Sequence, residues 1–118
     1  MPEFSSSLID IAVNLTDKAF QKDIDSVIER ASASGVEALV VTGTDLEESE
    51  QAVELARSYP EKLFSTAGVH PHYAKNCTPD TLPRIKSLLR EPSVKAVGET
   101  GLDFNRNFSP ADVQEKLF

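Results

Sequence analysis

The sequence has little of what marks secreted, membrane-spanning or strongly basic proteins. Cys77 is the single cysteine among 118 residues and cannot form an internal disulfide, which favours a reducing cytoplasm. No apolar run approaches the roughly 18 residues of a membrane helix, and the start of the chain does not have the pattern of a signal peptide. Basic residues are also scarce, since 12 Lys and Arg stand against 19 Asp and Glu, a formal net charge of −7. Attraction to a polyanion would therefore need a metal ion and a few local cations rather than a broad basic surface.

The length limits the fold. With 118 residues, 40% of them hydrophobic, the chain can bury one core, and no linker, repeat boundary or low-complexity tract divides it. We therefore expect residues 1–118 to belong to a single domain. A complete barrel of eight strand-helix units needs roughly 250 residues, so the chain can supply only part of such a barrel.

A strand followed by a helix recurs along the chain. Four short apolar runs are typical of buried strands: Leu8–Val13, Ala38–Thr42, Leu63–Val69 and Val94–Gly98. Helical spacing of apolar residues follows the first three runs. The first helix would end at Gly35, the second would start with a capping box from Thr44 to Glu47 and end before Pro60, and the third would hold Pro83 in its first turn. This alternation predicts an α/β fold with parallel strands and right-handed crossovers.

The two-residue period of a strand predicts which side chains face the axis of a barrel. The polar side of the first strand would face the axis, and it carries Asp10, Ala12 and Asn14. The aliphatic side would pack against the helix that carries Ile24, Val27 and Ile28, and it consists of Ile9, Ile11 and Val13. By the same alternation, three polar side chains beyond the third and fourth strands turn toward the axis: His70, His72 and Glu99.

Two motifs at strand ends carry the chemistry. They are Gly68–His72, which reads GVHPH, and Gly98–Asn107, which reads GETGLDFNRN. Catalytic side chains of strand-helix barrels lie at this end of the strands. Imidazole and carboxylate groups together suit a divalent metal ion, which polarises a phosphoryl oxygen and generates hydroxide from bound water. The motifs therefore predict a metal-dependent hydrolase.

Each of these residues also has a structural explanation. A His-Pro-His segment forms surface turns, a Glu after a strand is often solvated, and Asn14 could be a turn residue. Asp10 could accept hydrogen bonds from neighbouring backbone amides, although a carboxylate buried in a strand is costly without a partner. Asp103 and Arg106 could pair with each other or cap the next helix. Their occurrence together at successive strand ends favours the functional interpretation.

The motifs resemble those of the TatD family of metal-dependent deoxyribonucleases. The resemblance covers nearly the whole chain, and the Val13–Thr16 and Asp103–Asn107 stretches are similar to the TatD branch itself. It implies the first four strand-helix units of an amidohydrolase-like TIM barrel. It also implies an exonuclease that binds one or two divalent metal ions and hydrolyses phosphodiester bonds in DNA, at single strands or damaged ends.

The resemblance also assigns roles to residues. It implies that Glu99 contacts the metal ions and that His70 lines the substrate side, so these two residues are the predicted catalytic pair. Asp10 is predicted as a further metal ligand. A substrate-binding role is predicted for four others: His72, Asn14, Asp103 and Arg106.

Two departures from the family pattern refine these expectations. Many members carry a His-x-His pair in the first strand, where this chain has Ala12 and Asn14. That difference favours Mg²⁺ or Mn²⁺ with oxygen-rich ligands, with Zn²⁺ as the alternative. Two further His ligands and a final Asp would come from strands beyond residue 118. The 118 residues alone are therefore expected to lack nuclease activity and to bind Mg²⁺ or Mn²⁺ only weakly.

A second hypothesis gives the chain no catalysis. In it, the half-barrel is an assembly or interaction module that pairs with itself or with another chain through its open sheet edge. The sequence does not set the oligomeric state. For the first hypothesis the expected partner is DNA, with no membrane partner.

Overall fold

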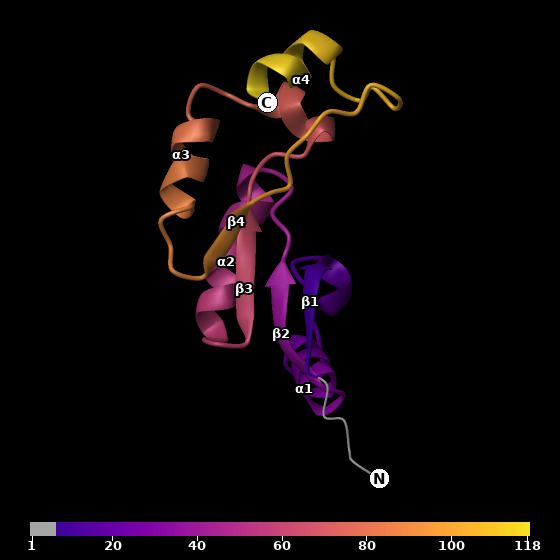
Figure 1. Ribbon diagram of the computed structural model, residues 1–118, viewed down its shortest axis with the longest axis vertical. Coiled ribbons are helices and arrows are strands. Elements are labelled where there is room, and N and C mark those ends of the chain that lie inside the picture. The colour runs from indigo at the N-terminus through magenta and orange to yellow at the C-terminus, as the bar shows by residue number, and fades with distance from the viewer. Residues whose placement is uncertain (1–6) are drawn as a thin grey trace.

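One parallel sheet of four strands forms the centre of the chain in the computed structural model, which describes residues 7–118 (Figure 1). The strands follow the chain order across the sheet, and they are β1 (Leu8–Val13), β2 (Val36–Val41), β3 (Leu63–Ala67) and β4 (Val94–Val97). Each strand pairs in parallel with the next. The carboxyl ends of all four strands therefore lie at the same edge of the sheet. Residues 1–6 of the expected domain lie outside the described part.

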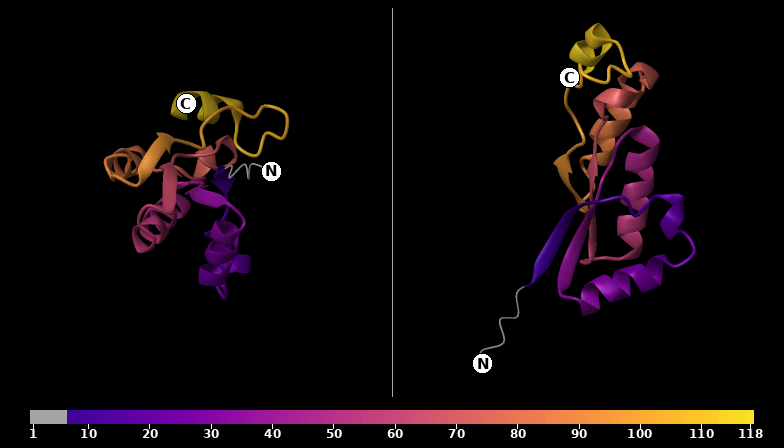
Figure 2. Two further views of the ribbon diagram at one scale, coloured as in Figure 1. Left: turned by 60° about the horizontal axis from the view of Figure 1, so that its bottom comes forward. Right: turned by 90° about the vertical axis from the view of Figure 1, so that its right-hand side faces the viewer.

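Helices connect the strands and lie on one side of the sheet. Three α-helices follow the first three strands, namely α1 (Ile24–Ala33), α2 (Leu46–Ser58) and α3 (Thr81–Leu88), and they fan out together in Figure 2. A short helix, α4 (Ala111–Leu117), ends the chain, and the 3₁₀ helices η1 (Lys18–Phe20) and η2 (Pro71–Asn76) lie in the loops after β1 and β3. The predicted alternation of strands and helices with parallel pairing is confirmed. Among residues 7–118, the longest helices fall short of the length and apolar character that a membrane crossing requires.

Two apolar clusters hold the helices to the sheet. The first packs α1 and α2 against β2 and β3, and its buried members are Leu15, Ile28, Leu39, Val41, Ala52, Ala56 and Leu63. The second lies under α3 and consists of Ala67, Val69 and Ile85, with Leu117 of α4 packed against it. Leu63, the first residue of β3, belongs to the first cluster, and Ala67, its last residue, belongs to the second. This central strand is thereby fixed along its whole length, and so is the loop that it leads into.

The element boundaries differ from the predicted ones by one or two residues. β2 begins at Val36 rather than Ala38, and β3 ends at Ala67 rather than Val69. The N-cap of α2 is Asp45, whose side chain accepts a 2.8 Å hydrogen bond from the Glu48 N–H, so the predicted capping box from Thr44 is wrong by one residue. Thr44 contributes its backbone instead, since its carbonyl accepts a hydrogen bond from the His70 N–H at 2.6 Å. Gly35 has the positive φ of 96° expected for a residue that ends a helix.

The predicted packing of β1 is confirmed only at its end. Val13 packs against the first cluster, but Ile9 and Ile11 are 59% and 73% exposed. β1 is an edge strand, and its register with β2 shifts between Asp10 and Val13, so the simple alternation does not run through the strand. Asp10 is exposed too, and its Oδ1 accepts only a long 3.5 Å bond from the Ala12 N–H. The expectation of a buried Asp10 carboxylate is therefore wrong.

Candidate functional site

The loop after β2 holds the two predicted catalytic residues side by side. Its Gly43 carbonyl accepts the Glu99 N–H at 2.6 Å, and the next carbonyl, of Thr44, accepts the His70 N–H at 2.6 Å. These bonds fix the segments that leave β3 and β4 at the same edge. His70 Nε2 lies 3.9 Å from Glu99 Oε2, and the two side chains are 26% and 46% exposed. An imidazole and a carboxylate thus meet at the carboxyl end of the sheet, as the sequence predicts.

Gly68 permits the close approach of these two segments. A Cβ atom at this position would lie 2.3 Å from the backbone oxygen of Glu99 and 2.7 Å from the carbonyl carbon of Gly98. Both neighbours are backbone atoms, so a larger residue would push the Glu99 segment away from β3. The glycine that opens the first motif is therefore needed for packing rather than for a turn.

The proton on His70 is directed toward Glu99. His70 Nδ1 accepts a 3.1 Å hydrogen bond from the His72 N–H, in a turn that Pro71 starts. A neutral imidazole with an accepting Nδ1 carries its proton on Nε2. Nε2 is the atom that faces Glu99, so His70 can donate a hydrogen bond into the hollow at this end of the sheet. That hollow is lined by His70, Pro71 and residues 97–103.

His72 forms a pair with Asp103 from the loop after β4. Its Nε2 lies 2.6 Å from Asp103 Oδ2, while Asp103 Oδ1 accepts the N–H groups of Asn105 and Arg106, each at 3.1 Å. The hydrogen bond from His72, followed by the one from the Arg106 backbone, lowers the pKa of Asp103 below its usual value. Asp103 therefore contacts Arg106 through the Arg106 backbone N–H and not through its guanidinium group. The N-cap of α4 is Pro110. The two structural alternatives for Asp103, an ion pair with Arg106 and a cap of the next helix, are therefore wrong.

The lowered pKa of Asp103 predicts a loss of stability in acid. The unfolded carboxyl titrates near 3.8, and the folded one below that value, so its contribution to the free energy of unfolding is present above pH 3.8. The contribution is lost as the pH falls from 3.8 through the folded pKa. Asp103→Asn removes the titrating group, so urea unfolding of this variant should depend less on pH below 4 than that of the unmodified chain. Parallel curves for the two proteins in this range would contradict the assignment.

Two buried polar residues that the sequence analysis did not single out hold this loop in place. Gln114 is 1% exposed, and its Oε1 accepts the Asp103 N–H at 2.7 Å. Its Nε2 donates to the carbonyls of Asp103 and Ser109, at 3.1 and 2.7 Å. Ser109 is fully buried, donates to the His72 carbonyl at 2.9 Å and accepts the Lys75 N–H at 3.0 Å. α4 thereby joins the loop after β4 to η2 through buried hydrogen bonds.

Other predicted site residues lie apart from the His70 and Glu99 pair. Asn14 lines a separate hollow at the ends of β1 and β2, together with Thr44, Glu48 and Tyr73. Asp10 lines neither hollow, and Arg106 is exposed on the loop after β4. Within residues 7–118, no three His, Cys, Asp or Glu side chains come together in a group that could hold a metal ion. Glu99 supplies one carboxylate donor at the hollow around His70, which is fewer than a metal site needs.

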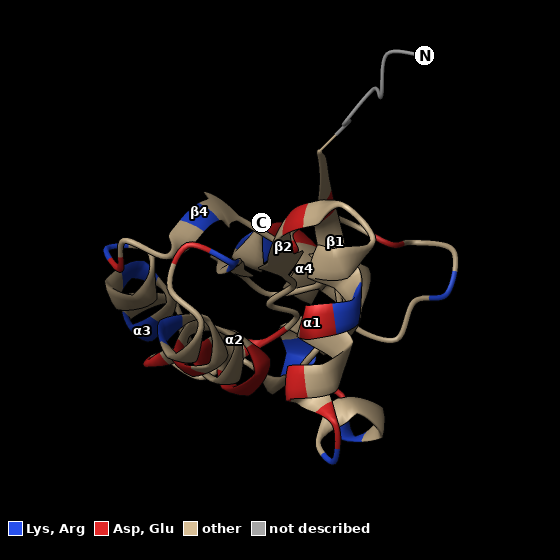
Figure 3. Cartoon of the chain, turned by 90° about the horizontal axis from the view of Figure 1, so that it is seen from below, with Lys and Arg blue, Asp and Glu red and all other residues tan. Residues whose placement is uncertain are grey.

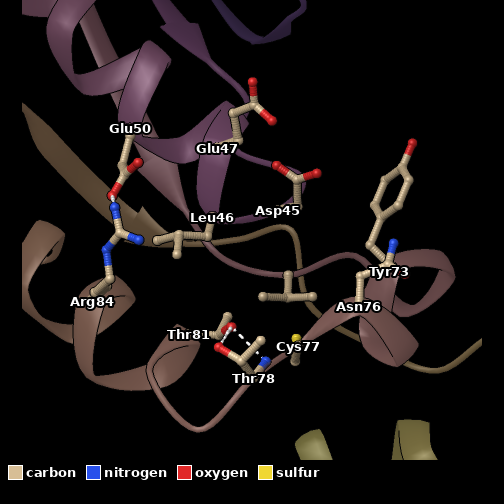
Figure 4. Close-up of a pocket in the computed structure, with 11 residues that line it drawn as sticks. Asp45, Leu46, Glu47, Glu50, Tyr73, Asn76, Cys77, Thr78, Thr81 and Arg84 are labelled. Atoms are coloured by element: carbon tan, nitrogen blue, oxygen red, sulfur yellow. Dashed lines mark hydrogen bonds and ion pairs between the residues drawn. The ribbon is translucent and has the colours of Figure 1, made fainter.

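A further hollow lies between α2, η2 and α3 (Figure 4). Arg84 of α3 bonds Glu50 of α2 at its rim, and Thr81 Oγ1 accepts the Thr78 N–H at 2.9 Å inside it. Cys77 also lines it, and burial raises the pKa of the thiol, which keeps Cys77 protonated and poorly nucleophilic. None of the predicted site residues lines this hollow, and its contacts join the helices of the outer layer.

Comparison with known proteins identifies close relatives. The family described as TatD related DNase matches residues 9–118. Proteins described as 3′-5′ ssDNA/RNA exonuclease TatD from Salmonella typhimurium and Citrobacter rodentium are 50% and 52% identical to the chain over 111 residues. Each alignment covers 94% of this chain and 42% of the relative. The chain therefore spans less than half the length of the curated relatives it matches.

Solved structures agree in fold. A TatD family hydrolase from Entamoeba histolytica superposes with a TM-score of 0.85 at 30% identity, covering 95% of this chain and 43% of that one. YjjV, a TatD homologue from Escherichia coli K12, gives a TM-score of 0.82 at 28% identity, covering 93% and 43%. The predicted fold class, the first four strand-helix units of an amidohydrolase-like TIM barrel, is confirmed.

Proposed function

The chain belongs to the TatD family, and from this membership we propose that it supplies the first part of the active site of a metal-dependent exonuclease. The proposed substrate is single-stranded DNA or a damaged DNA end, and the proposed reaction is hydrolysis of a phosphodiester bond. The observation that carries the proposal is the juxtaposition of His70 and Glu99, whose backbones bond to adjacent carbonyls of one loop. The names of the curated relatives support a single-stranded substrate, and they include RNA.

We propose that Glu99 supplies one carboxylate ligand to Mg²⁺ or Mn²⁺, with Asp10 as a second ligand from β1. Such an ion would lower the pKa of a bound water molecule and offset negative charge on the reacting phosphoryl group. His70 would donate its Nε2 proton to a phosphate oxygen, because its Nδ1 is already occupied by the His72 N–H. The remaining ligands would come from parts of the barrel other than residues 7–118. Within these residues, no three His, Cys, Asp or Glu side chains form a group that could hold a metal ion.

The other predicted residues would bind the substrate strand. His72 and Asp103 form a rigid pair beside His70, Arg106 offers a cation on the same loop, and Asn14 lies at the end of β1. The composition supports a cytoplasmic location for this activity, because the chain contains one cysteine.

A chimera tests the proposed function. This chain would replace the matched 111 residues of the Salmonella relative, which then supplies the rest of the barrel. We expect the chimera to shorten a labelled single-stranded oligonucleotide in Mg²⁺ or Mn²⁺ and to stop when EDTA removes the ion. The chain alone should not hydrolyse the oligonucleotide. A folded chimera without metal-dependent hydrolysis would contradict the proposal.

In the second hypothesis, an interaction module, the exposed apolar residues on the edge strands would form the contact with a partner. Ile11 on β1 is 73% exposed and Val97 on β4 is 61% exposed, and both strands have one unpaired edge within the described sheet. Such edges pair readily with other strands. A folded but inactive chimera would favour this second function over the first.

A further inference from the structure

The loop after β4 presents aromatic side chains to solvent beside the proposed active site. In residues 102–108, here called the aromatic loop, Leu102 is 44% exposed, Phe104 is 51% exposed and Phe108 is 56% exposed. The loop projects from the body of the chain in Figure 1. Large exposed aromatic side chains grouped on one short loop are a feature of binding surfaces.

A run of rings connects this loop to the catalytic pair. The ring centroids of Phe108 and His72 lie 4.8 Å apart at an interplanar angle of 90°, and those of His72 and His70 lie 4.1 Å apart. Because the Phe108 and His72 rings are perpendicular, at least one face of Phe108 is not covered by His72. Phe108 is also 56% exposed, so a large part of this residue is accessible to a ligand. A ligand stacked there would lie two rings away from His70 and the Glu99 carboxylate.

The loop is fixed in place although its aromatic side chains are exposed. Asp103 near its start is held by His72 and by the buried Gln114, and Ser109 directly after its end is held by Gln114 and by η2. Asp103 also accepts two backbone N–H groups from within the loop. A platform fixed in this way loses little conformational entropy when a ligand binds.

Charge decides which ligand fits the aromatic loop. The chain carries a net charge of −7, and α1 and α2 present acidic segments in Figure 3, so phosphate attraction alone cannot hold a nucleic acid. Arg106 offers a local cation, while Asp103 is paired with His72. Stacking of a base on an aromatic ring adds about 1–3 kcal/mol per base to single-strand binding, and only unpaired bases expose the faces it needs.

We infer that the aromatic loop is a stacking platform for an unpaired nucleobase, with Phe108 as its main contact and Arg106 near the adjoining phosphates. This inference rests on the proposed function, since it names how the substrate strand is held beside the catalytic pair. It adds a contribution to single-strand binding that does not depend on the net charge of the chain. It also gives a reason for a preference for single strands, because a base within a duplex cannot reach Phe108.

A tryptophan introduced at position 108 would report the contact by its fluorescence, because the sequence contains no other tryptophan. In the Phe108→Trp chain, an oligothymidylate of about eight nucleotides, within the range that one binding domain covers, should quench the tryptophan fluorescence in buffer with EDTA. An oligonucleotide of equal length with abasic sites should not. Equal quenching by both, or no binding of oligothymidylate to the chain, would overturn the inference.

Substitution by leucine separates stacking from apolar contact. Phe108→Leu keeps an apolar side chain without a ring face, and we expect its affinity for labelled oligothymidylate to fall about tenfold in fluorescence anisotropy. Phe118→Leu is the matched control, because Phe118 directly follows α4 and is 70% exposed. This variant should bind oligothymidylate with the affinity of the unmodified chain. Unchanged binding by Phe108→Leu would overturn the inference while hydrolysis by the chimera still supports the function. Quenching without any hydrolysis would contradict the function alone.

Discussion

Replacing Glu99 with alanine is expected to lower metal-dependent hydrolysis by the chimera at least about 100-fold, the scale seen when a main electrostatic element of an active site is removed. Glu99 is the carboxylate that the loop after β2 places 3.9 Å from His70 Nε2. Alanine leaves the backbone bond from Glu99 N–H to the Gly43 carbonyl in place, so the loop should keep its position. The loss should therefore reflect the missing carboxylate. Initial rates on a labelled single-stranded oligonucleotide measure it.

The control for this variant is Glu54→Ala, which removes an exposed carboxylate from α2 away from the hollow around His70. Its rate should match that of the unmodified chimera. Both variants should also unfold at the same temperature as the parent, because Glu54 is exposed and Glu99 is nearly half exposed. Activity of Glu99→Ala within a few-fold of the parent would remove Glu99 from the proposed metal site.

Local patterns in the sequence were enough to predict the meeting of His70 and Glu99. The carboxyl ends of parallel strands lie at one edge of a sheet, so residues a few positions after the neighbouring strands β3 and β4 come together. The need for glycine at position 68 emerges only from the structure, where a Cβ atom would collide with the Glu99 backbone. Short-range geometry of this kind survives small errors in strand boundaries, such as the two residues by which β3 ends early.

The side-chain directions of β1 could not be predicted in the same way. Alternation assumes a regular strand, whereas the pairing of β1 with β2 shifts register between Asp10 and Val13. Ile11 is 73% exposed instead of packed against α1. The ligand role of Asp10 depends on those same directions, so it stays a prediction.

Long-range side-chain hydrogen bonds were beyond the reach of the sequence patterns. His72 and Asp103 are 31 residues apart, and the sequence alone gave each of them a substrate role without linking them. Gln114 had even less signal, because a glutamine in a short helix is usually solvated. The one available hint is its spacing, three residues before Leu117, which places both residues on the buried face of α4.

Replacing Gln114 with methionine is expected to lower the free energy of unfolding by about 2 kcal/mol, the scale for buried polar groups that lose their partners. Methionine has a similar length but cannot bond the Asp103 N–H or the carbonyls of Asp103 and Ser109, now bonded at 2.7, 3.1 and 2.7 Å. Urea unfolding measures the change. Hydrogen exchange at Asp103 should speed up in the same variant, because the bond that protects its N–H is lost.

Gln51→Met is the matched control for this substitution. Gln51 is exposed on α2, and its side chain makes only a long 3.4 Å bond to Glu47, so the same chemical change should alter stability by less than about 0.5 kcal/mol. Because Gln114 also fixes both ends of the aromatic loop, its loss should weaken oligothymidylate binding, whereas Gln51→Met should leave binding unchanged. If Gln114→Met unfolds at the same urea concentration as Gln51→Met, the buried hydrogen bonds of α4 do not hold the loop, and the fixed platform beside His70 loses its structural basis.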